Sequence, residues 1–384
     1  MEKNAYLPLK YSQSMNMETL SAVLKKAAWA FAGRKKGKQH EQYDITCREI
    51  EDADADDILA MTGNPGFFTA GYRGVLRNLH DVLVRGTSFN RKYFESTDYE
   101  EEWRDLLVMS ALCDKWSRNR QVYEFDADFA RELANTRELS LYPEILRRLP
   151  YDTFYLEHGG IEEFSPVNGV FVNIRVFNDG GMEVLLYRTV GNMYLSGRYR
   201  FDRKDAETDG DYIYYRFDKS LIRHRSDLGK FPVQGGNAPV KFDNSGFGDM
   251  AAFYFQAVCY LCSKKPDISR NIVTRKIYRP SSGTPADGGS LSQIRKWDVG
   301  LYYGNVIRMQ REENGGTREE RPGGAKTSAS NGNRKPVRPH CRCAHWHHYW
   351  TGKGRTKLEI RWVQPSFVSA DTDGMPVRIN RVEK

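Results

Sequence analysis

The chain has 384 residues and a formal net charge of +8, with 40% hydrophobic and 28% charged residues. These totals exclude a wholly disordered protein, because enough apolar side chains are present to form a sizeable core. No uninterrupted apolar run approaches the roughly 20 residues that cross a bilayer, which predicts a cytoplasmic protein without a membrane partner. The basic excess favours acidic partners, of which nucleic acid is the commonest. The six cysteines show no disulfide spacing, so reduced thiols are expected.

The first 150 residues are predicted to form a mainly helical domain. Apolar residues recur at helical spacing in the N-terminal segment, and the segment from Thr46 to Thr62, with the acidic stretch EIEDADADD, predicts a polar-faced helix. Helices are predicted over 20–31, 46–62, 72–85, 98–118, 126–135 and 140–148. The last of them ends at Leu149-Pro150, because the residue before a proline disfavours helical backbone.

After Pro150 the apolar period changes from 3.6 to 2, which indicates strands. The predicted strands are TFYLE, GVFVNIRVF, MEVLLYRTV, MYLSGRYRF, YIYYRF, NIVTRKIY and KWDVGLYYGNVIRM. The sequence NDGG at 178–181 predicts a tight hairpin, so we expect an antiparallel meander. Residues 249–262 are apolar almost all round and predict one buried helix within a β-rich domain that spans 151–310.

Residues 311–338 are rich in Gly, Ser, Asn and charge, which predicts a disordered or mobile insert. The strand pattern returns in 339–384. Strands over 342–350 and 357–364 would form a basic, aromatic hairpin with TGKGR at its tip, completing the C-terminal domain. The predicted fold class is therefore α+β, with a helical N-terminal half followed by an antiparallel β-rich C-terminal half with one buried helix.

The segment PHCRCAHWHHYW at 339–350 is dense in metal-ligand residue types. Alternation along a strand would place four of them on one face, namely Cys341, Cys343, His345 and His347. Neighbours on that face lie about 6.6 Å apart, whereas zinc holds four ligands at about 2.0–2.3 Å, so a strand supplies one adjacent pair at most. Cys259-x-x-Cys262 could add ligands, but such a pair in an apolar helix is more often two core thiols. We predict no metal and no cofactor, and leave open whether these cysteines hold an ion.

The same region combines basic and aromatic side chains, and Glu359 is its only acid between positions 334 and 361. Basic groups meet phosphates and flat aromatic groups stack on unpaired bases. The pattern therefore favours contact with nucleic acid or the ribosome. The candidate contact residues are Arg338, His340, Arg342, His345, His347, Tyr349, Lys353, Arg355 and Lys357.

Two other interpretations of the hairpin remain open. In the first it is an ordinary core element, because alternation puts two aromatic-rich sets of side chains on shared faces. These sets are Trp346, His348 and Trp350 on one strand and Leu358, Ile360 and Trp362 on its partner. In the second, an RNA-cleaving enzyme uses His345 or His347 as general acid and base, with Lys353 or Arg355 stabilising the phosphorane-like charge. A dense histidine cluster without a known spacing assigns no catalytic residue, so the enzyme is less favoured.

Two segments resemble a known family. LRRLPYDTFYLE at 146–157, VRPHCRCAHWHHYWTGKGRTKLEIRWVQPSFV at 337–368, and the order of helical and β-rich halves resemble the second anti-CRISPR family of type V-A. Its members belong to phages and mobile elements. The resemblance covers much of the chain and is most specific in the C-terminal segment. In relatives, basic or aromatic residues commonly stand at the positions of Cys341 and Cys343, so the resemblance implies no shared zinc site.

The resemblance implies a protein of the bacterial host cytoplasm that lowers production of the type V-A effector nuclease. The implied mechanism is recognition of the effector's nascent N-terminal peptide during translation, followed by loss of the effector's mRNA. The implied partners are therefore the nascent effector polypeptide and, with it, the ribosome and the mRNA. No peptide-binding residue follows from the resemblance. An RNA-binding accessory protein of a mobile element is the remaining alternative.

Overall fold

The computed structural model describes residues 6–14, 53–63, 99–136, 139–165, 167, 169–190, 193–195, 197–209, 211–217, 230–232, 247–270, 294–315, 340–342 and 344–368. The predicted helices over 20–31 and 72–85 and the predicted strand NIVTRKIY lie outside these residues. Most of the predicted insert at 311–338 lies outside them as well.

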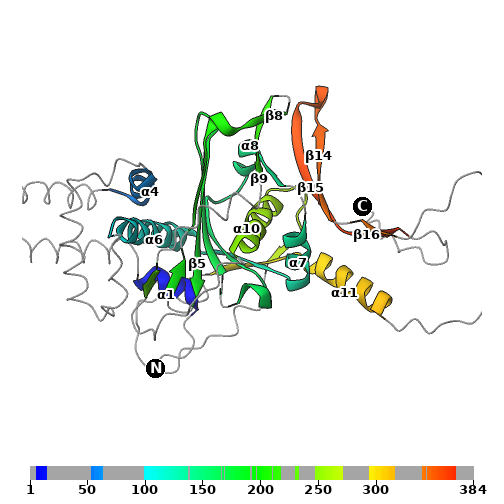
Figure 1. Cartoon of the computed structure of the whole chain (residues 1–384), viewed down its shortest axis with the longest axis horizontal. Coiled ribbons are helices and arrows are strands. Elements are labelled where there is room, and N and C mark those ends of the chain that lie inside the picture. The colour runs from blue at the N-terminus through cyan, green and yellow to red at the C-terminus, as the bar shows by residue number, and fades with distance from the viewer. Residues whose placement is uncertain are drawn as a thin grey trace, which may run out of the picture.

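A large sheet forms the centre of the fold (Figure 1). It has nine strands in the order β10-β6-β5-β4-β3-β1-β12-β11, with β7 also paired to β5. Its strands are β1 (Gln121–Phe125), β3 (Thr153–Glu157), β4 (Gly169–Val176), β5 (Met182–Val190), β6 (Met193–Leu195), β7 (Arg198–Phe201), β10 (Lys230–Pro232), β11 (Ile268–Arg270) and β12 (Arg295–Val299). The run from β3 to β6 is antiparallel, as predicted, and NDGG joins β4 to β5. The α+β class is thereby confirmed.

The strands that follow residue 150 pair antiparallel with one another, as predicted, whereas β1 is a strand that the prediction of a mainly helical first half missed, and it pairs in parallel with both β3 and β12. Parallel neighbours need a crossover of a dozen or more residues, and the chain between β1 and β3 provides one. It contains α7 (Ala127–Asn135), β2 (Leu139–Leu141) and α8 (Pro143–Leu146). The predicted helix over 140–148 is shorter than expected, because β2 takes its first residues and Pro143 begins α8. β1 thus lies in the first 150 residues yet occupies an interior place in the sheet.

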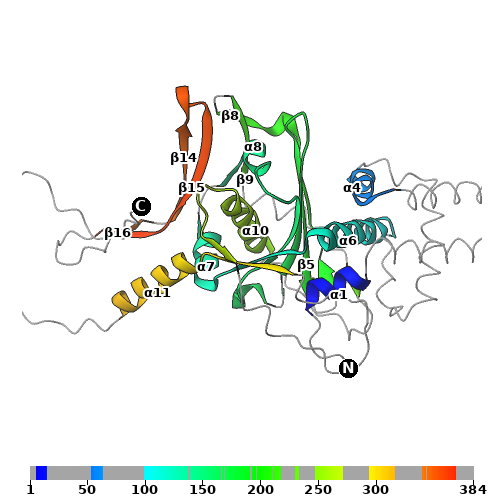
Figure 2. The same ribbon diagram turned by 180° about the vertical axis from the view of Figure 1, so that it is seen from behind.

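Helices cover both faces of the large sheet (Figures 1 and 2). On one side lie α1 (Leu7–Ser14), α4 (Ala55–Gly63) and α6 (Tyr99–Asn119), and on the other lies α10 (Phe247–Leu261). Phe171 of β4 packs edge-on against Trp116 of α6 at 5.8 Å between ring centroids. Phe253 of α10 packs against Phe125 of β1 at 5.7 Å. The predicted helices over 98–118, 126–135 and 249–262 are confirmed as α6, α7 and α10.

The segment KWDVGLYYGNVIRM does not form one strand, as predicted. It forms β12 up to Val299 and then α11 (Leu301–Gly315), with Gly300 at φ +78° between them. Glycine adopts this left-handed conformation without steric cost, so the chain can change direction at this residue. A side chain at Gly300 would overlap the Phe129 ring of α7. α11 continues to residue 315, so the beginning of the predicted insert at 311–338 is helical rather than disordered.

Two smaller assemblies complete the described fold. β2 joins β8 (Glu207–Asp209) and β9 (Tyr212–Phe217) in a three-stranded sheet, so YIYYRF lies outside the large sheet. The C-terminal segment forms β13 (His340–Arg342) with β16 (Ser366–Val368) and β14 (His345–Thr351) with β15 (Lys357–Val363). α10 lies between the large sheet and the β14–β15 hairpin (Figures 1 and 2). None of the described helices is both long and apolar enough to span a membrane.

Candidate functional site

The β14–β15 hairpin is a regular antiparallel ladder that separates its side chains into two faces. Its register runs from the pair His345 and Val363 to the pair Thr351 and Lys357. The tip turns through Gly352 and Gly354, whose φ angles are +82° and +77°. These backbone conformations suit glycine, which explains why TGKGR forms the tip.

The inner face of the hairpin packs against the hydrophobic core. Leu358, Ile360 and Trp362 are buried, and Trp346 and Trp350 are partly buried against the same cluster. Trp362 is 2% exposed, and its ring lies 5.0 Å from that of Phe129. The predicted sharing of faces is therefore confirmed. Trp362 is thereby unavailable for stacking on bases, whereas Trp346 and Trp350 keep part of their surface exposed.

A polar network ties this inner face to α10 and to the end of α7. The indole of Trp346 donates to Gln256 Oε1, and Gln256 Nε2 donates to the backbone carbonyl of Thr136 at 3.1 Å. The indole of Trp362 donates to the Thr136 hydroxyl at 3.0 Å. Buried indole N–H groups need such partners, since an unpaired one costs about 1–3 kcal/mol. The network holds the hairpin in a fixed orientation relative to the body.

The outer face carries most of the predicted contact residues. Those with exposed side chains are His345, His347, Tyr349, Lys353, Arg355 and Lys357. The rings of His347 and Tyr349 lie 4.2 Å apart with 31° between their planes, which makes a small aromatic platform. Platforms of this kind stack on bases, and the lysine and arginine at the tip can meet phosphates.

Glu359 is the one acidic side chain on the outer face of this hairpin, and it is engaged by cations. Lys264 Nζ lies 2.5 Å and Lys357 Nζ 3.5 Å from its carboxylate. The hydrogen bond from Lys264 is the main cause that lowers the pKa of Glu359. The carboxylate is therefore ionised at neutral pH and its charge is neutralised locally, which leaves the surrounding face basic.

The candidate set omits Arg361, which is exposed and lies directly opposite His347 in the ladder. Arg361 is four residues after Lys357 in the same predicted strand, and this even separation could have placed its side chain on the same face. Lys264, which follows α10, has no signal in the local sequence, because only the tertiary fold brings it to Glu359. His340 and Arg342 lie on β13, but only their backbone is described. Arg338 lies outside the described residues.

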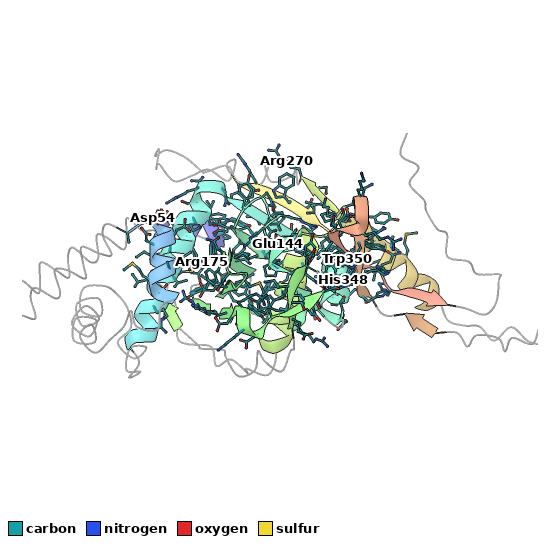
Figure 3. The ribbon with its side chains drawn as sticks, turned by 90° about the horizontal axis from the view of Figure 1, so that it is seen from above. Asp54, Glu144, Arg175, Arg270, His348 and Trp350 are labelled. Atoms are coloured by element: carbon teal, nitrogen blue, oxygen red, sulfur yellow. The ribbon has the colours of Figure 1, made fainter. Side chains whose placement is uncertain are left out.

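The three histidines of the β14–β15 hairpin lie on two faces. His345 and His347 are on the outer face, whereas His348 is on the inner face, with its ring 5.3 Å from that of Tyr142. Figure 3 labels His348 close to Trp350. Burial lowers the pKa of His348. General acid–base cleavage of RNA needs two groups that reach the same phosphodiester. His345 and His347 share the outer face and His348 does not, so the interpretation as an RNA-cleaving enzyme stays an untested alternative.

No group of three or more potential ligands that could hold a metal occurs among the described residues. Cys259 of α10 and Cys262, which directly follows α10, are free, buried thiols. Burial raises the pKa of Cys259 to about 12, and that of Cys262 well above its ordinary value. Both are therefore protonated at neutral pH. The side chains of Cys341 and Cys343 lie outside the description, so the absence of a metal stays a prediction.

Known proteins resemble the chain at the levels of family, sequence and structure. The Escherichia coli protein FinQ is 24% identical over 214 residues, which are 52% of this chain and 60% of FinQ, so the chain spans about 60% of that curated relative. The crystal structure of AcrVA2 matches 82% of this chain and 94% of its own, at 16% identity and a TM-score of 0.38. The family model AcrVA2-like, described as the anti-CRISPR type V subtype A2 family, matches residues 123–370. That match extends from β1 to β16 and covers more than half of the chain, so the chain belongs to this anti-CRISPR family.

Proposed function

We propose that the protein inhibits type V-A CRISPR immunity by lowering production of the effector nuclease. It recognises the effector's nascent N-terminal peptide during translation and triggers loss of the effector's mRNA in the cytoplasm of the bacterial host. The observation that carries the proposal is the family match over 123–370, which includes the whole β14–β15 hairpin. Nascent effector, ribosome and mRNA are the partners.

The outer face of the hairpin is the proposed contact with RNA or the ribosome. Its exposed lysine, arginine and histidine side chains, with the platform of His347 and Tyr349, support this role. Phosphate contacts of this kind are sensitive to salt, because binding releases counterions. His347→Glu combined with Lys357→Glu should weaken association with ribosomes and make its loss with rising salt shallower, because fewer counterions are released on binding.

A reporter experiment tests the proposed function directly. The protein is co-expressed with a reporter that carries the first codons of a type V-A effector, or with a frameshifted version of nearly identical RNA. The mRNA of the in-frame reporter should fall selectively, because only that reporter makes the recognised peptide. Equal loss of both mRNAs, or loss of neither, would contradict nascent-peptide recognition.

Incubation of purified protein with labelled RNA separates this function from that of an RNA-cleaving enzyme. The proposed function predicts intact RNA in this assay. Cleavage that disappears in His345→Ala and His347→Ala but persists in Trp346→Ala would instead assign the chemistry to the histidines.

A further inference from the structure

The two long edges of the β14–β15 hairpin differ in the described part of the structure. On the outside of β15, Leu358 N donates to the Tyr212 hydroxyl at 3.3 Å and Arg148 Nη2 donates to Leu358 O at 2.8 Å. Two residues further along β15, Lys264 N donates to Ile360 O at 2.8 Å. This edge is therefore closed by the body of the protein.

These contacts also reveal which backbone groups of β14 point outward. Since Leu358 and Ile360 direct their polar groups away from β14, they belong to the non-hydrogen-bonded pairs of the antiparallel ladder. Their opposite residues, Trp350 and His348, must likewise direct N–H and C=O away from β15. Alternation gives Trp346 the same orientation. No hydrogen bond from the described residues reaches these backbone groups.

An open edge of this kind is a template for one more strand. A strand that paired with β14 would lie about 4.8 Å beyond it and about 10 Å from β15. Its alternate side chains would extend the two existing faces. On the inner side they would meet Trp346 and Trp350, which are only partly buried. On the outer side they would meet His345 and His347, with Lys357 within reach.

Charge decides which kind of strand fits. Lys353, Arg355, Lys357 and Arg361 are exposed on this hairpin, and Glu359 is already engaged by Lys264 and Lys357. A distance of about 10 Å is close to the Debye length at physiological salt, so these cations still attract acids on an added strand. RNA is disfavoured at this edge, because regularly spaced peptide N–H and C=O groups match another peptide backbone and the tryptophan rings face inward.

We propose that the open edge of β14 binds an extended peptide by β-augmentation, and that this peptide alternates acidic with apolar side chains. Backbone pairing to Trp346, His348 and Trp350 supplies the affinity, and the two faces supply the specificity. The proposal rests on the proposed function only for the natural source of the peptide, the nascent effector. The docking mode can be tested without that protein.

The test selects ligands for the full-length protein from a displayed library of random nine-residue peptides. Enriched peptides should alternate acidic and apolar residues. His348→Pro removes one outward N–H and places a ring against the added strand, while the ladder bonds of the neighbouring residues to β15 remain. Binding of the enriched peptides should fall about tenfold or more. His348→Ala is the matched control, because it loses the imidazole as His348→Pro does but keeps the backbone N–H. It should bind the enriched peptides within about twofold of the unmodified protein.

A second measurement uses the unmodified protein and so does not depend on the folding of a variant. One enriched peptide is made with N-methyl groups at even positions and again at odd positions. In a paired strand only one of these sets of N–H groups faces β14, so only one version should lose about tenfold or more in affinity.

Three results would overturn the proposal: no enrichment of peptides, equal binding to His348→Pro and His348→Ala, or equal effects of the two methylation patterns. A short oligouridylate is the comparison ligand. If it binds the protein and His348→Pro alike while no peptide is enriched, the surface belongs to RNA and the edge proposal fails. Because no effector peptide is used, failure here leaves the reporter result intact, and failure of the reporter leaves this result intact.

Discussion

Replacing Trp362 by alanine should show how strongly the inner face of the hairpin holds the C-terminal segment in place. Trp362 is 2% exposed and packs against Phe129 and Tyr303, at 5.0 and 5.4 Å between ring centroids. Truncation of a buried tryptophan to alanine costs about 3–5 kcal/mol through lost transfer energy and the cavity left behind. The substitution also removes the hydrogen bond from the indole to the Thr136 hydroxyl. That hydroxyl still donates to Glu132 O at 3.0 Å, so it keeps one hydrogen-bond partner.

Urea unfolding followed by circular dichroism measures the change in the free energy of unfolding. Tyr349→Ala is the matched control, because Tyr349 is 36% exposed on the opposite face of the same hairpin and should change stability by less than about 0.5 kcal/mol. Trp362→Phe should fall between the two, because it keeps an aromatic ring but loses the donor. A loss below about 1 kcal/mol in Trp362→Ala would refute the packing argument. An unchanged midpoint with a lower urea slope would show that the hairpin unfolds separately from the body.

Three further outcomes are expected. Gly300→Ala should lower the free energy of unfolding by about 2–4 kcal/mol in the urea assay, because its side chain would overlap a buried ring and its φ is +78°. Gly160→Ala, with φ +77° but open space around it, should cost only about 1 kcal/mol, and equal losses would contradict the steric account. Buried, protonated Cys259 and Cys262 should react with a thiol reagent at neutral pH only after denaturation, and rapid reaction of the native protein would contradict their burial. His348 has a folded-state pKa below its ordinary value of 6.5, so stability should be fully present above pH 6.5 and fall as pH drops toward the lower folded pKa; His348→Asn should reduce that fall.

Much of the fold follows from local patterns in the sequence. Alternation in TFYLE and in MEVLLYRTV predicts β3 and β5, and the apolar run at 249–262 predicts α10. The same alternation assigns Trp362 to the inner face of the hairpin and His347 to its outer face. These predictions succeed because a side chain's face depends on neighbours two or four residues away.

Predictions based on the same patterns fail where distant segments decide the outcome. KWDVG and LYYGNVIRM were predicted as one strand, but Gly300 at φ +78° and the packing of Tyr303 against Phe129, at 5.7 Å, divide them into β12 and α11. The parallel place of β1 depends on strands that begin at Thr153 and Arg295. No local signal identifies such partners.

The β14–β15 hairpin also shows which properties are local and which depend on distant segments. The sequence alone predicts a hairpin of strands over 342–350 and 357–364 with aromatic side chains on shared faces, because a period of two is a property of the strand backbone. Only the tertiary structure decided that β15 is closed by Tyr212, Arg148 and Lys264, so that β14 keeps the open edge. The reason is that the hydrogen-bond partners of a strand edge can come from any part of the chain that lies within about 3 Å of it. Which segments lie that close is set by the packing of the whole core.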